Sequence, residues 1–384
     1  MTSISSVSAM DNALAPHIRT VKTHSILPAA PHIASTTHIL IDADSGKILA
    51  KKGIDERRPP ASLTKVMTVY VISKAIQSGQ ISLDDKVTIS KKAWRTPGSK
   101  MFIKEGQRVT LKSLLQGIIV DSGNDACVAV AEYIAGSEKN FAILMNKHAV
   151  ALGMTNTNFT ESTGLPDKNL YSSAKDLAIL SRAIIKDFPE NYHWFKQKWF
   201  SFNGIKQPNR NRLLWRNPFV DGIKTGHTDN AGHALIASAK KDNMRLIAVI
   251  LGAPSDAARS DGGQRLLTYG FRFYETHKLY DAFKSISDTR VWKGNVNQVN
   301  LGVEHPLVVT IPTGSYHNLD VSTTLEKQLE APIEKGQILG RLMIRLNGKL
   351  LAKRDLVALE TVQKGGLFSR LGDSISLSVN RLTQ

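Results

Sequence analysis

The chain has 384 residues, of which 42% are hydrophobic and 22% are charged. This length allows two domains with a sizeable core, and the composition excludes a disordered or fibrous protein. No apolar run approaches the ~20 residues of a membrane-spanning helix. The net charge of +17 favours an anionic partner. Because the basic residues are scattered and not interleaved with aromatic residues, we interpret the charge as an adaptation to an anionic cell envelope and predict no nucleic-acid partner.

Residues 1–35 show little hydrophobic periodicity and are predicted to form an N-terminal arm. They lack the 7–15-residue apolar stretch of a signal peptide. The stretch Ser5-Ser6-Val7-Ser8-Ala9 nevertheless has the small-x-small form of a signal-peptidase site. Two interpretations therefore stay open, a disordered leader and the remnant of an export signal.

Residues 36–275 mix strand and helix patterns and predict an α+β domain. Residues 38–42 and 47–50 flank a glycine-containing turn and predict a β-hairpin. The residues Pro59-Pro60 precede a predicted helix that begins near Ala61 and is apolar nearly all round, as a buried helix is. The other predicted elements are helices at 111–119, 125–134, 141–152, 173–185 and 264–274, a loop at 163–167, and antiparallel strands at 234–239 and 245–252.

The pattern changes near Thr276. Short β-type segments at 307–311, 339–346 and 350–357, separated by turn residues, predict a small all-β domain over 276–363. In residues 364–384 apolar side chains recur at helical spacing, which predicts an amphipathic helix lying on a membrane surface. A packed or disordered tail is the alternative for this last segment.

Three short motifs occur in one order along the chain: Ser62-Leu63-Thr64-Lys65, Ser122-Gly123-Asn124 and Lys224-Thr225-Gly226. The patterns S-x-x-K and S-x-N also occur elsewhere, whereas K-T-G occurs once. Each motif alone is weak. Together, in this order, they match the signature of penicillin-recognising serine acyl enzymes.

The first motif can supply an activated nucleophile. Ser62 and Lys65 are three residues apart and therefore lie on one helix face. A neutral lysine can take the serine proton if its pKa is lowered by burial or by a second cation, for which Lys224 is the candidate. The alternative is an ordinary capping serine followed by an exposed lysine.

The other two motifs offer groups that can bind a substrate. Ser122 can relay a proton and Asn124 can hold a substrate amide. Both also precede a predicted helix, and the alternative interpretation is that they cap it. The motif Lys224-Thr225-Gly226 begins a predicted edge strand, where Gly226 permits close approach and the lysine and threonine can bind a carboxylate. The backbone N–H groups of Ser62 and His227 could form an oxyanion hole; the His227 ring is predicted to line the site.

Metal and thiol chemistry are not indicated. The eleven histidines form no H-x-x-x-H or H-E-x-x-H pattern, so we predict no metal and no cofactor. The single cysteine, Cys127, lies in an apolar helical stretch and is predicted to be a buried small hydrophobic residue.

The segments around these motifs resemble the D-alanyl-D-alanine carboxypeptidases among the low-molecular-weight penicillin-binding proteins. The similarity is dense over residues 24–275 and looser beyond. It is carried by residues 60–68, 122–126, 209–215, 221–228 and 266–271. The resemblance implies a β-lactamase/transpeptidase-like domain, with an antiparallel sheet flanked by helices, then a small all-β domain and a C-terminal amphipathic helix. It also implies a periplasmic protein held at the outer face of the inner membrane.

Carried over residue by residue, the resemblance assigns roles to ten positions. Ser62 becomes the acylated nucleophile, Lys65 its base and Ser122 the proton relay. The implied substrate-binding residues are Asn124, Lys224, Thr225, Gly226, His227, Arg259 and Arg210. Some relatives have histidine where this chain has Thr163, so the sequence assigns no role to the loop that follows it.

We therefore predict a serine-type carboxypeptidase that removes the terminal D-alanine from peptidoglycan stem pentapeptides and is acylated by β-lactams. A class A β-lactamase is less well matched, because the loop Glu161-Ser162-Thr163-Gly164-Leu165 lacks the Glu-x-x-Leu-Asn pattern of that class. A D,D-endopeptidase has the same motifs. A non-catalytic scaffold, in which the β-rich domain recruits a protein partner, is the remaining alternative.

Overall fold

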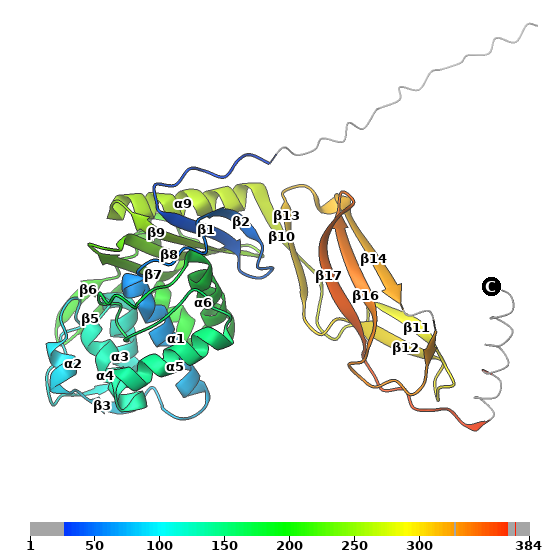
Figure 1. The fold of residues 1–384 in the computed structure, drawn as a ribbon, viewed down its shortest axis with the longest axis horizontal. Helices are drawn as coiled ribbons and strands as arrows, with labels where there is room; N and C mark the ends of the chain where they lie inside the picture. Colours follow the sequence, from blue (N-terminus) through cyan, green and yellow to red (C-terminus); the bar gives the residue numbers. More distant parts are fainter. Residues whose placement is uncertain (1–26, 326–327, 368–372, 374–384) are drawn as a thin grey trace, which may run out of the picture.

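The computed structural model describes residues 27–325, 328–367 and 373. Two units lie side by side, a helix-rich catalytic domain and a β-rich domain (Figure 1). The predicted N-terminal arm is described only from residue 27, and the predicted amphipathic helix at 364–384 lies almost wholly outside the described residues. Within the described part of the chain, no helix has both the length and the apolar character needed to cross a bilayer.

A five-stranded antiparallel sheet forms the centre of the catalytic domain, in the order β2-β1-β9-β8-β7. Its strands are β1 (Thr37–Asp42), β2 (Ile48–Lys52), β7 (Val220–Thr228), β8 (Gly232–Lys241) and β9 (Met244–Ala253). Successive side chains alternate between the two faces of the sheet. Thus Leu40 and Leu235 pack under helix α9 (Asp256–Phe273), whereas Ile39 and Ile236 face the helical layer on the other side. The predicted sheet flanked by helices is confirmed (Figure 1).

The helical layer is built around α1 (Thr64–Gln77), which follows the 3-10 turn η1 (Ala61–Leu63). Eleven of its fourteen residues are buried, as its all-round apolar sequence predicts. The surrounding elements are α2 (Lys91–Arg95), α3 (Leu111–Gln116), the π-helical turn η2 (Gly117–Asp121), α4 (Asn124–Ala135), α5 (Glu138–Ala151), α6 (Ala174–Asp187), α7 (Pro189–Tyr192), η3 (His193–Lys196) and α8 (Leu213–Arg216). Two small hairpins complete the domain, β3 (Lys86–Thr88) with β4 (Arg108–Thr110) and β5 (Trp199–Phe202) with β6 (Ile205–Pro208).

Two sequence predictions were wrong at helix ends. Helix α9 begins at Asp256 rather than near Gln264, because the Ser255 side chain caps it by accepting the Ala258 N–H. The first half of this helix contains the Gly262–Gly263 pair, which hides its periodicity. The helix predicted over 111–119 ends at Gln116 and continues as the π turn η2.

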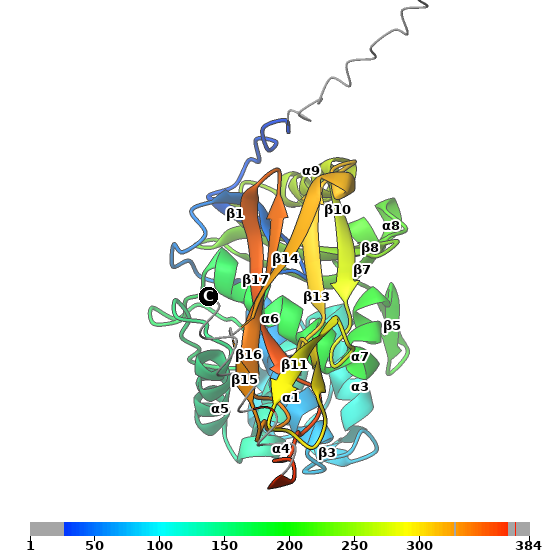
Figure 2. The same ribbon diagram turned by 90° about the vertical axis from the view of Figure 1, so that its right-hand side faces the viewer.

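The β-rich domain confirms the predicted small all-β unit (Figure 2). It consists of the pair β10 (Tyr274–Tyr280) and β13 (Leu307–Pro312) and of a six-stranded sheet in the order β14-β16-β17-β12-β11-β15. The strands of that sheet are β11 (Ser287–Trp292), β12 (Gln298–Gly302), β14 (Leu319–Leu325), β15 (Leu329–Glu330), β16 (Ile338–Leu346) and β17 (Lys349–Ala358).

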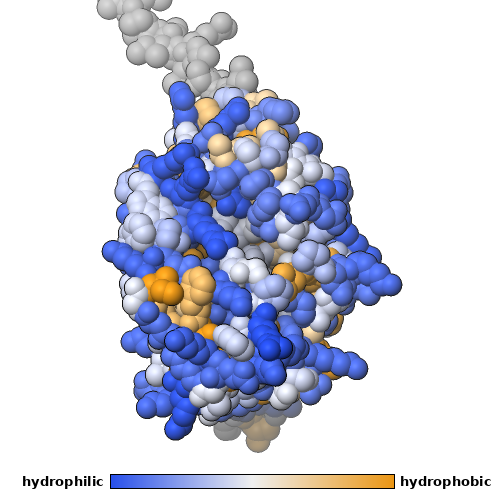
Figure 3. Space-filling model, turned by 90° about the vertical axis from the view of Figure 1, so that its left-hand side faces the viewer, coloured by the Kyte–Doolittle hydropathy of each residue, from blue (hydrophilic) through white to orange (hydrophobic). Residues whose placement is uncertain are grey.

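A polar cluster joins the two domains at the β1–β2 turn. The buried Asp42 carboxylate accepts a hydrogen bond from Thr276 Oγ1 at 2.7 Å. Lys47 Nζ donates to the Thr310 carbonyl at 2.8 Å, and the Ser45 and Thr310 hydroxyls lie 2.6 Å apart. The β-rich domain is therefore attached beside the β1–β2 hairpin (Figure 1). The opposite end of the molecule is a mainly hydrophilic surface with small hydrophobic patches (Figure 3).

Candidate active site

The three sequence motifs come from three separate elements of the catalytic domain and meet at Ser62. Ser62 lies in η1 directly before α1, Asn124 begins α4, and Lys224 lies on β7. Lys65 Nζ is 3.1 Å from Ser62 Oγ and 2.7 Å from Asn124 Oδ1. A side chain on Gly226 would come within 3.2 Å of the Ser62 backbone nitrogen. The first and second motifs are thus joined by hydrogen bonds, and the third by close backbone packing.

Lys65 is removed from water. It is 1% exposed, and its ammonium has a third acceptor, the Thr163 carbonyl, at 2.5 Å. Burial lowers the pKa of Lys65, and the charge of Arg210 lowers it further, whereas Cys127 and Glu161 act in the opposite direction. A lysine with a lowered pKa and direct contact with a serine hydroxyl can act as a general base. The alternative of an exposed lysine beside a capping serine is excluded.

The second motif has an unexpected backbone. Ser122, rather than Gly123, has the left-handed conformation, with φ +60° against −60°. Neither Ser122 nor Asn124 caps α4, because the N-cap residue is Gly123 and no side chain caps this end of the helix. Asn124 Nδ2 instead donates to the Pro97 carbonyl at 2.7 Å. The asparagine is therefore fixed between Lys65 and the 97–99 segment, and the capping interpretation was wrong.

The neighbouring Asp125 supports this wall of the site. Its buried carboxylate accepts the backbone N–H groups of Met101 and Phe102, each at 3.0 Å. The backbone N–H of Asn124 donates to the Ser99 carbonyl at 2.7 Å. As predicted, Cys127 is buried in α4, and burial raises the pKa of its thiol to about 12.

The third motif places a second buried lysine near the first. Lys224 is 4% exposed; burial lowers its pKa well below the ordinary value, and the charges of Lys65 and Arg210 add to this effect. Thr225, beside it, is also buried. Within the described residues β7 pairs only with β8, so its other edge is free to face η1 and the site. The predicted edge position is confirmed, but the strand begins at Val220, so the K-T-G motif lies within it rather than at its start.

The remaining predicted substrate-binding residues have different surroundings. Arg259 is buried on α9, where Nη1 donates to the Gly226 carbonyl at 2.8 Å and Nη2 lies 2.5 Å from Asp256. Arg210 is exposed and donates to Ser99 Oγ at 2.8 Å. The exposed His227 ring stacks on His233, with centroids 4.1 Å apart. Direct contact of these side chains with a substrate stays a prediction.

The predicted loop at 163–167 is present, but sequence reasoning missed its contact with the nucleophile segment. Thr163 contributes its carbonyl rather than its side chain, and Gly164 has φ +88°. A Cβ at Gly164 would lie 1.9 Å from the Ala61 carbonyl oxygen and 2.9 Å from the Ser62 nitrogen. The T-G-L-P sequence showed a loop at this position, but no residue type in it indicated contact with the nucleophile.

Asp121 is another acidic residue that the sequence did not single out. It ends the η2 turn, is 2% exposed and has one carboxylate oxygen without a hydrogen-bond partner. Burial, followed by repulsion from Asp125, raises the pKa of Asp121 to about 7, while Arg210 and Lys224 oppose the shift.

Comparison with known proteins places this geometry in a family. Residues 24–255 match the family described as D-alanyl-D-alanine carboxypeptidase, and residues 274–364 match the penicillin-binding protein 5 C-terminal domain. The D-alanyl-D-alanine carboxypeptidase DacC of Escherichia coli K12 is 46% identical over 360 residues, covering 92% of this chain and 90% of the relative. DacA of the same organism is 43% identical over 371 residues, covering 94% and 92%.

A solved structure agrees with both matches. The crystal structure of penicillin binding protein 5 from Haemophilus influenzae superposes with a TM-score of 0.85 at 44% identity, covering 88% of this chain and 100% of that chain. The chain belongs to the D-alanyl-D-alanine carboxypeptidase family. Membership confirms the prediction made from the three motifs and identifies the chain as a serine-type carboxypeptidase. The predicted succession of peptidase domain and β domain is confirmed as well.

Gly164→Ala tests the packing of the loop on the nucleophile. The new Cβ would clash with the Ala61 backbone and displace Ser62, so the rate of acylation by labelled penicillin is expected to fall by about 10²-fold. Gly153→Ala is the matched control, since Gly153 has φ +77° and nothing within 4 Å of its Cβ position. Equal acylation rates in the two variants would show that the contact is irrelevant.

Asp121→Asn tests the buried carboxyl through stability. The pKa of Asp121 is about 7 in the folded protein against 3.8 ordinarily, so the folded state binds this proton more tightly. The free energy of unfolding of the wild type should therefore fall between about pH 4 and pH 7 relative to the variant. At ~1.4 kcal/mol per pKa unit, a pKa raised from 3.8 to about 7 makes this relative fall on the order of 4 kcal/mol by pH 8.

The measurement is urea unfolding of both proteins at pH 4.5 and pH 8. Asp229→Asn, in the exposed β7–β8 turn, is the matched control. A stability difference between wild type and Asp121→Asn that is the same at both pH values would contradict the assignment.

Proposed function

We propose that the chain removes the terminal D-alanine from peptidoglycan stem pentapeptides through an acyl-enzyme on Ser62. The observation that supports this most strongly is the buried Lys65 side chain, whose Nζ lies 3.1 Å from Ser62 Oγ. Family membership gives the reaction type, and the site supplies a nucleophile, a base and cations for a terminal carboxylate.

In the first step, neutral Lys65 takes the proton of Ser62 as Oγ attacks the carbonyl between the two D-alanines. The backbone N–H groups of Ser62 and His227 stabilise the negative charge on the carbonyl oxygen, at roughly 3–4 kcal/mol per donor in known cases. Ser122 relays the proton to the departing D-alanine amine, and Asn124 holds the substrate amide. The C–N bond breaks and an ester on Ser62 is left.

In the second step, water attacks the ester carbonyl, the shortened peptide leaves as a carboxylate, and Ser62 regains its proton. β-Lactams enter as substrate mimics: Ser62 opens the ring and forms the same type of ester. No leaving group departs, because the amine stays tethered.

The electrostatics of the site favour a substrate with a free carboxylate. Burial is the main cause of the lowered pKa values of Lys65 and Lys224, and repulsion adds to it, from Arg210 at both lysines and from Lys65 at Lys224. An anionic terminus offsets this repulsion. Lys224 and Thr225 are its proposed partners, with Arg210 at the mouth and Arg259 supporting the strand from behind through the Gly226 carbonyl.

The wider organisation is proposed on the same basis. Residues 36–275 form the peptidase domain, 276–363 the β-rich domain and 364–384 an amphipathic helix that holds the protein on the outer face of the inner membrane. The relatives' names and the net charge of +17 support an extracytoplasmic, periplasmic location at an anionic envelope. The β-rich domain is a candidate site for a protein partner.

The test is release of D-alanine from a peptide ending in D-Ala-D-Ala. Wild type should release it, and Ser62→Ala should lose at least ~10³-fold of this activity because the nucleophile is absent. Ser201→Ala is the matched control, since Ser201 belongs to another S-x-N sequence and is exposed on β5. If wild type cleaves only cross-linked peptides, the enzyme is an endopeptidase. If it binds stem peptides and cleaves neither substrate, the scaffold alternative holds.

A further inference from the structure

The loop of residues 161–165 completes the surroundings of Lys65. Its Thr163 carbonyl accepts a hydrogen bond from Lys65 Nζ at 2.5 Å. The preceding carbonyl, of Ser162, accepts from Thr68 Oγ1 at 2.6 Å, one turn further along α1. The loop thus lies against α1 and directs two successive carbonyl groups at the helix. Lys65 and Thr68, in the first turns of α1, donate hydrogen bonds to these carbonyls.

Glu161 holds this loop in shape. Its Oε2 atom accepts hydrogen bonds from the Thr163 backbone N–H, at 2.7 Å, and from the Thr163 hydroxyl. Its Oε1 atom accepts from the Gly164 backbone N–H. The Thr163 hydroxyl in turn accepts from the Leu165 N–H at 3.1 Å. Both carboxylate oxygens are therefore used to close a turn whose Thr163 carbonyl is directed at Lys65.

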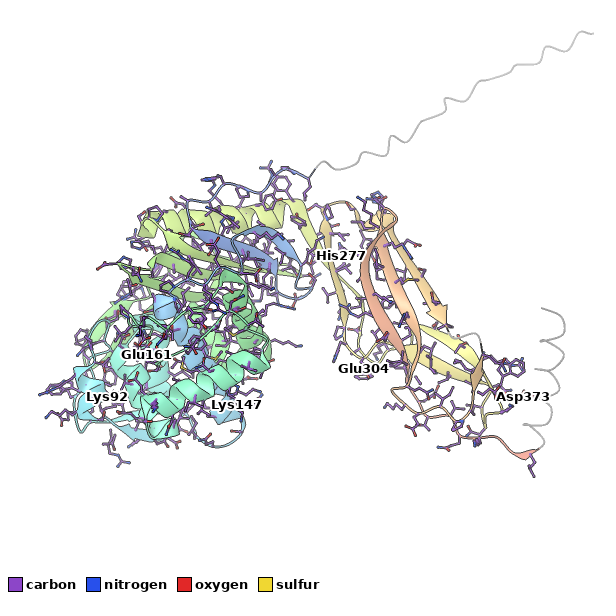
Figure 4. All side chains as sticks on the ribbon, in the orientation of Figure 1. Lys92, Lys147, Glu161, His277, Glu304 and Asp373 are labelled. Atoms are coloured by element: carbon purple, nitrogen blue, oxygen red, sulfur yellow. The ribbon has the colours of Figure 1, made fainter. Side chains whose placement is uncertain are left out.

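Packing alone does not explain this conformation. The loop borders a cavity of about 420 Å³, which Glu161, Thr163 and Leu165 line together with Lys92 and Glu138. Hydrogen bonds to a charged group are stronger than neutral ones, so the bonds that Glu161 accepts contribute to the conformation of the loop beside its packing. Glu161 lies inside the catalytic domain, whereas Lys92 lies at its outer edge (Figure 4).

A second carboxylate, that of Glu138, contacts the same loop. Glu138 accepts the Ser162 hydroxyl at 2.9 Å and forms an ion pair with Lys92 at 2.7 Å. Among the charges that shift the pKa of Lys65, Glu161 raises it, opposing burial; Glu138 is not one of the main contributors. Both glutamates therefore support the loop, but only Glu161 is also among the main charges that raise the pKa of Lys65.

We propose that Glu161 is a positioning residue of the acyl-transfer reaction, whose carboxylate shapes the 161–165 loop so that the Thr163 carbonyl orients Lys65 toward Ser62. The negative charge of Glu161 also raises the pKa of Lys65, against the larger effect of burial. This inference rests on the proposed role of Lys65 as the base. It explains how the chain dispenses with the histidine that some relatives carry at position 163, since any residue at that position supplies the carbonyl.

Glu161→Gln in the full chain tests the proposal, with the pH dependence of acylation by labelled penicillin as the readout. The variant lacks the charge, so the pKa of Lys65 falls further and the acidic limb of the rate profile should move to lower pH by about half a unit or more. The amide nitrogen cannot accept the hydrogen bond that one carboxylate oxygen accepts, so the plateau rate should fall roughly tenfold.

Two further variants separate the charge from the shape of the loop. Glu161→Asp keeps the charge on a shorter side chain. The acidic limb of its acylation rate profile should therefore stay at the same pH, while the plateau rate falls. Glu138→Gln should leave the limb unmoved. The proposal is overturned if the acidic limb of Glu161→Gln lies at the same pH as that of the wild type. It is also overturned if Glu138→Gln shifts the limb by as much as Glu161→Gln does. If Glu161→Gln does not fold, a shifted limb in Glu161→Asp also overturns it.

The readout does not depend on carboxypeptidase activity. If penicillin acylates the wild type but the wild type releases no D-alanine, the proposed function is refuted. The pH positions of the acidic limbs would still decide the role of Glu161.

Discussion

The site depends on the burial of one ammonium group, that of Lys65. A charged lysine in the interior costs several kcal/mol unless its donors are satisfied or its proton is lost. Here the three donors of Lys65 meet Ser62 Oγ, Asn124 Oδ1 and the Thr163 carbonyl. Each acceptor comes from a different segment, so burial of the lysine both lowers its pKa and fixes where those segments lie.

The backbone of Ser62 is confined from two sides by residues that lack side chains. Gly226 of β7 lies on one side, and Gly164 of the 161–165 loop on the other; a Cβ on either would come close to the Ser62 nitrogen. The edge strand, the loop and η1 therefore act as one unit. The fold brings the basic groups of Lys65, Lys224 and Arg210 together, which creates a positive electrostatic potential in the site. A carboxylate reduces this potential, so the arrangement favours a substrate with a carboxylate.

The sequence correctly predicted the elements and residues that depend on which side chains occur, and in what pattern. The apolar runs of β8 and β9 and the all-round apolar α1 gave correct elements, and the three motifs identified the family. Features carried by the backbone left no such signal. The Thr163 carbonyl, the left-handed Ser122 and the π turn before it depend on chain geometry rather than on particular side chains. In the sequence, Glu161 stands out only as a mismatch to the class A β-lactamase pattern, because its hydrogen bonds form only in the folded loop.

Lys65→Arg tests most directly whether the buried lysine is the base. Arginine keeps a buried cation and hydrogen-bond donors but cannot lose its proton at any accessible pH. The measurement is the mass of an acyl adduct on the Ser62 peptide after incubation with penicillin at pH 6 to 10, with thermal unfolding as the check on folding. A folded variant that forms no adduct at any pH is the predicted result. A folded variant that forms the adduct at a rate near that of wild type would contradict the role of Lys65.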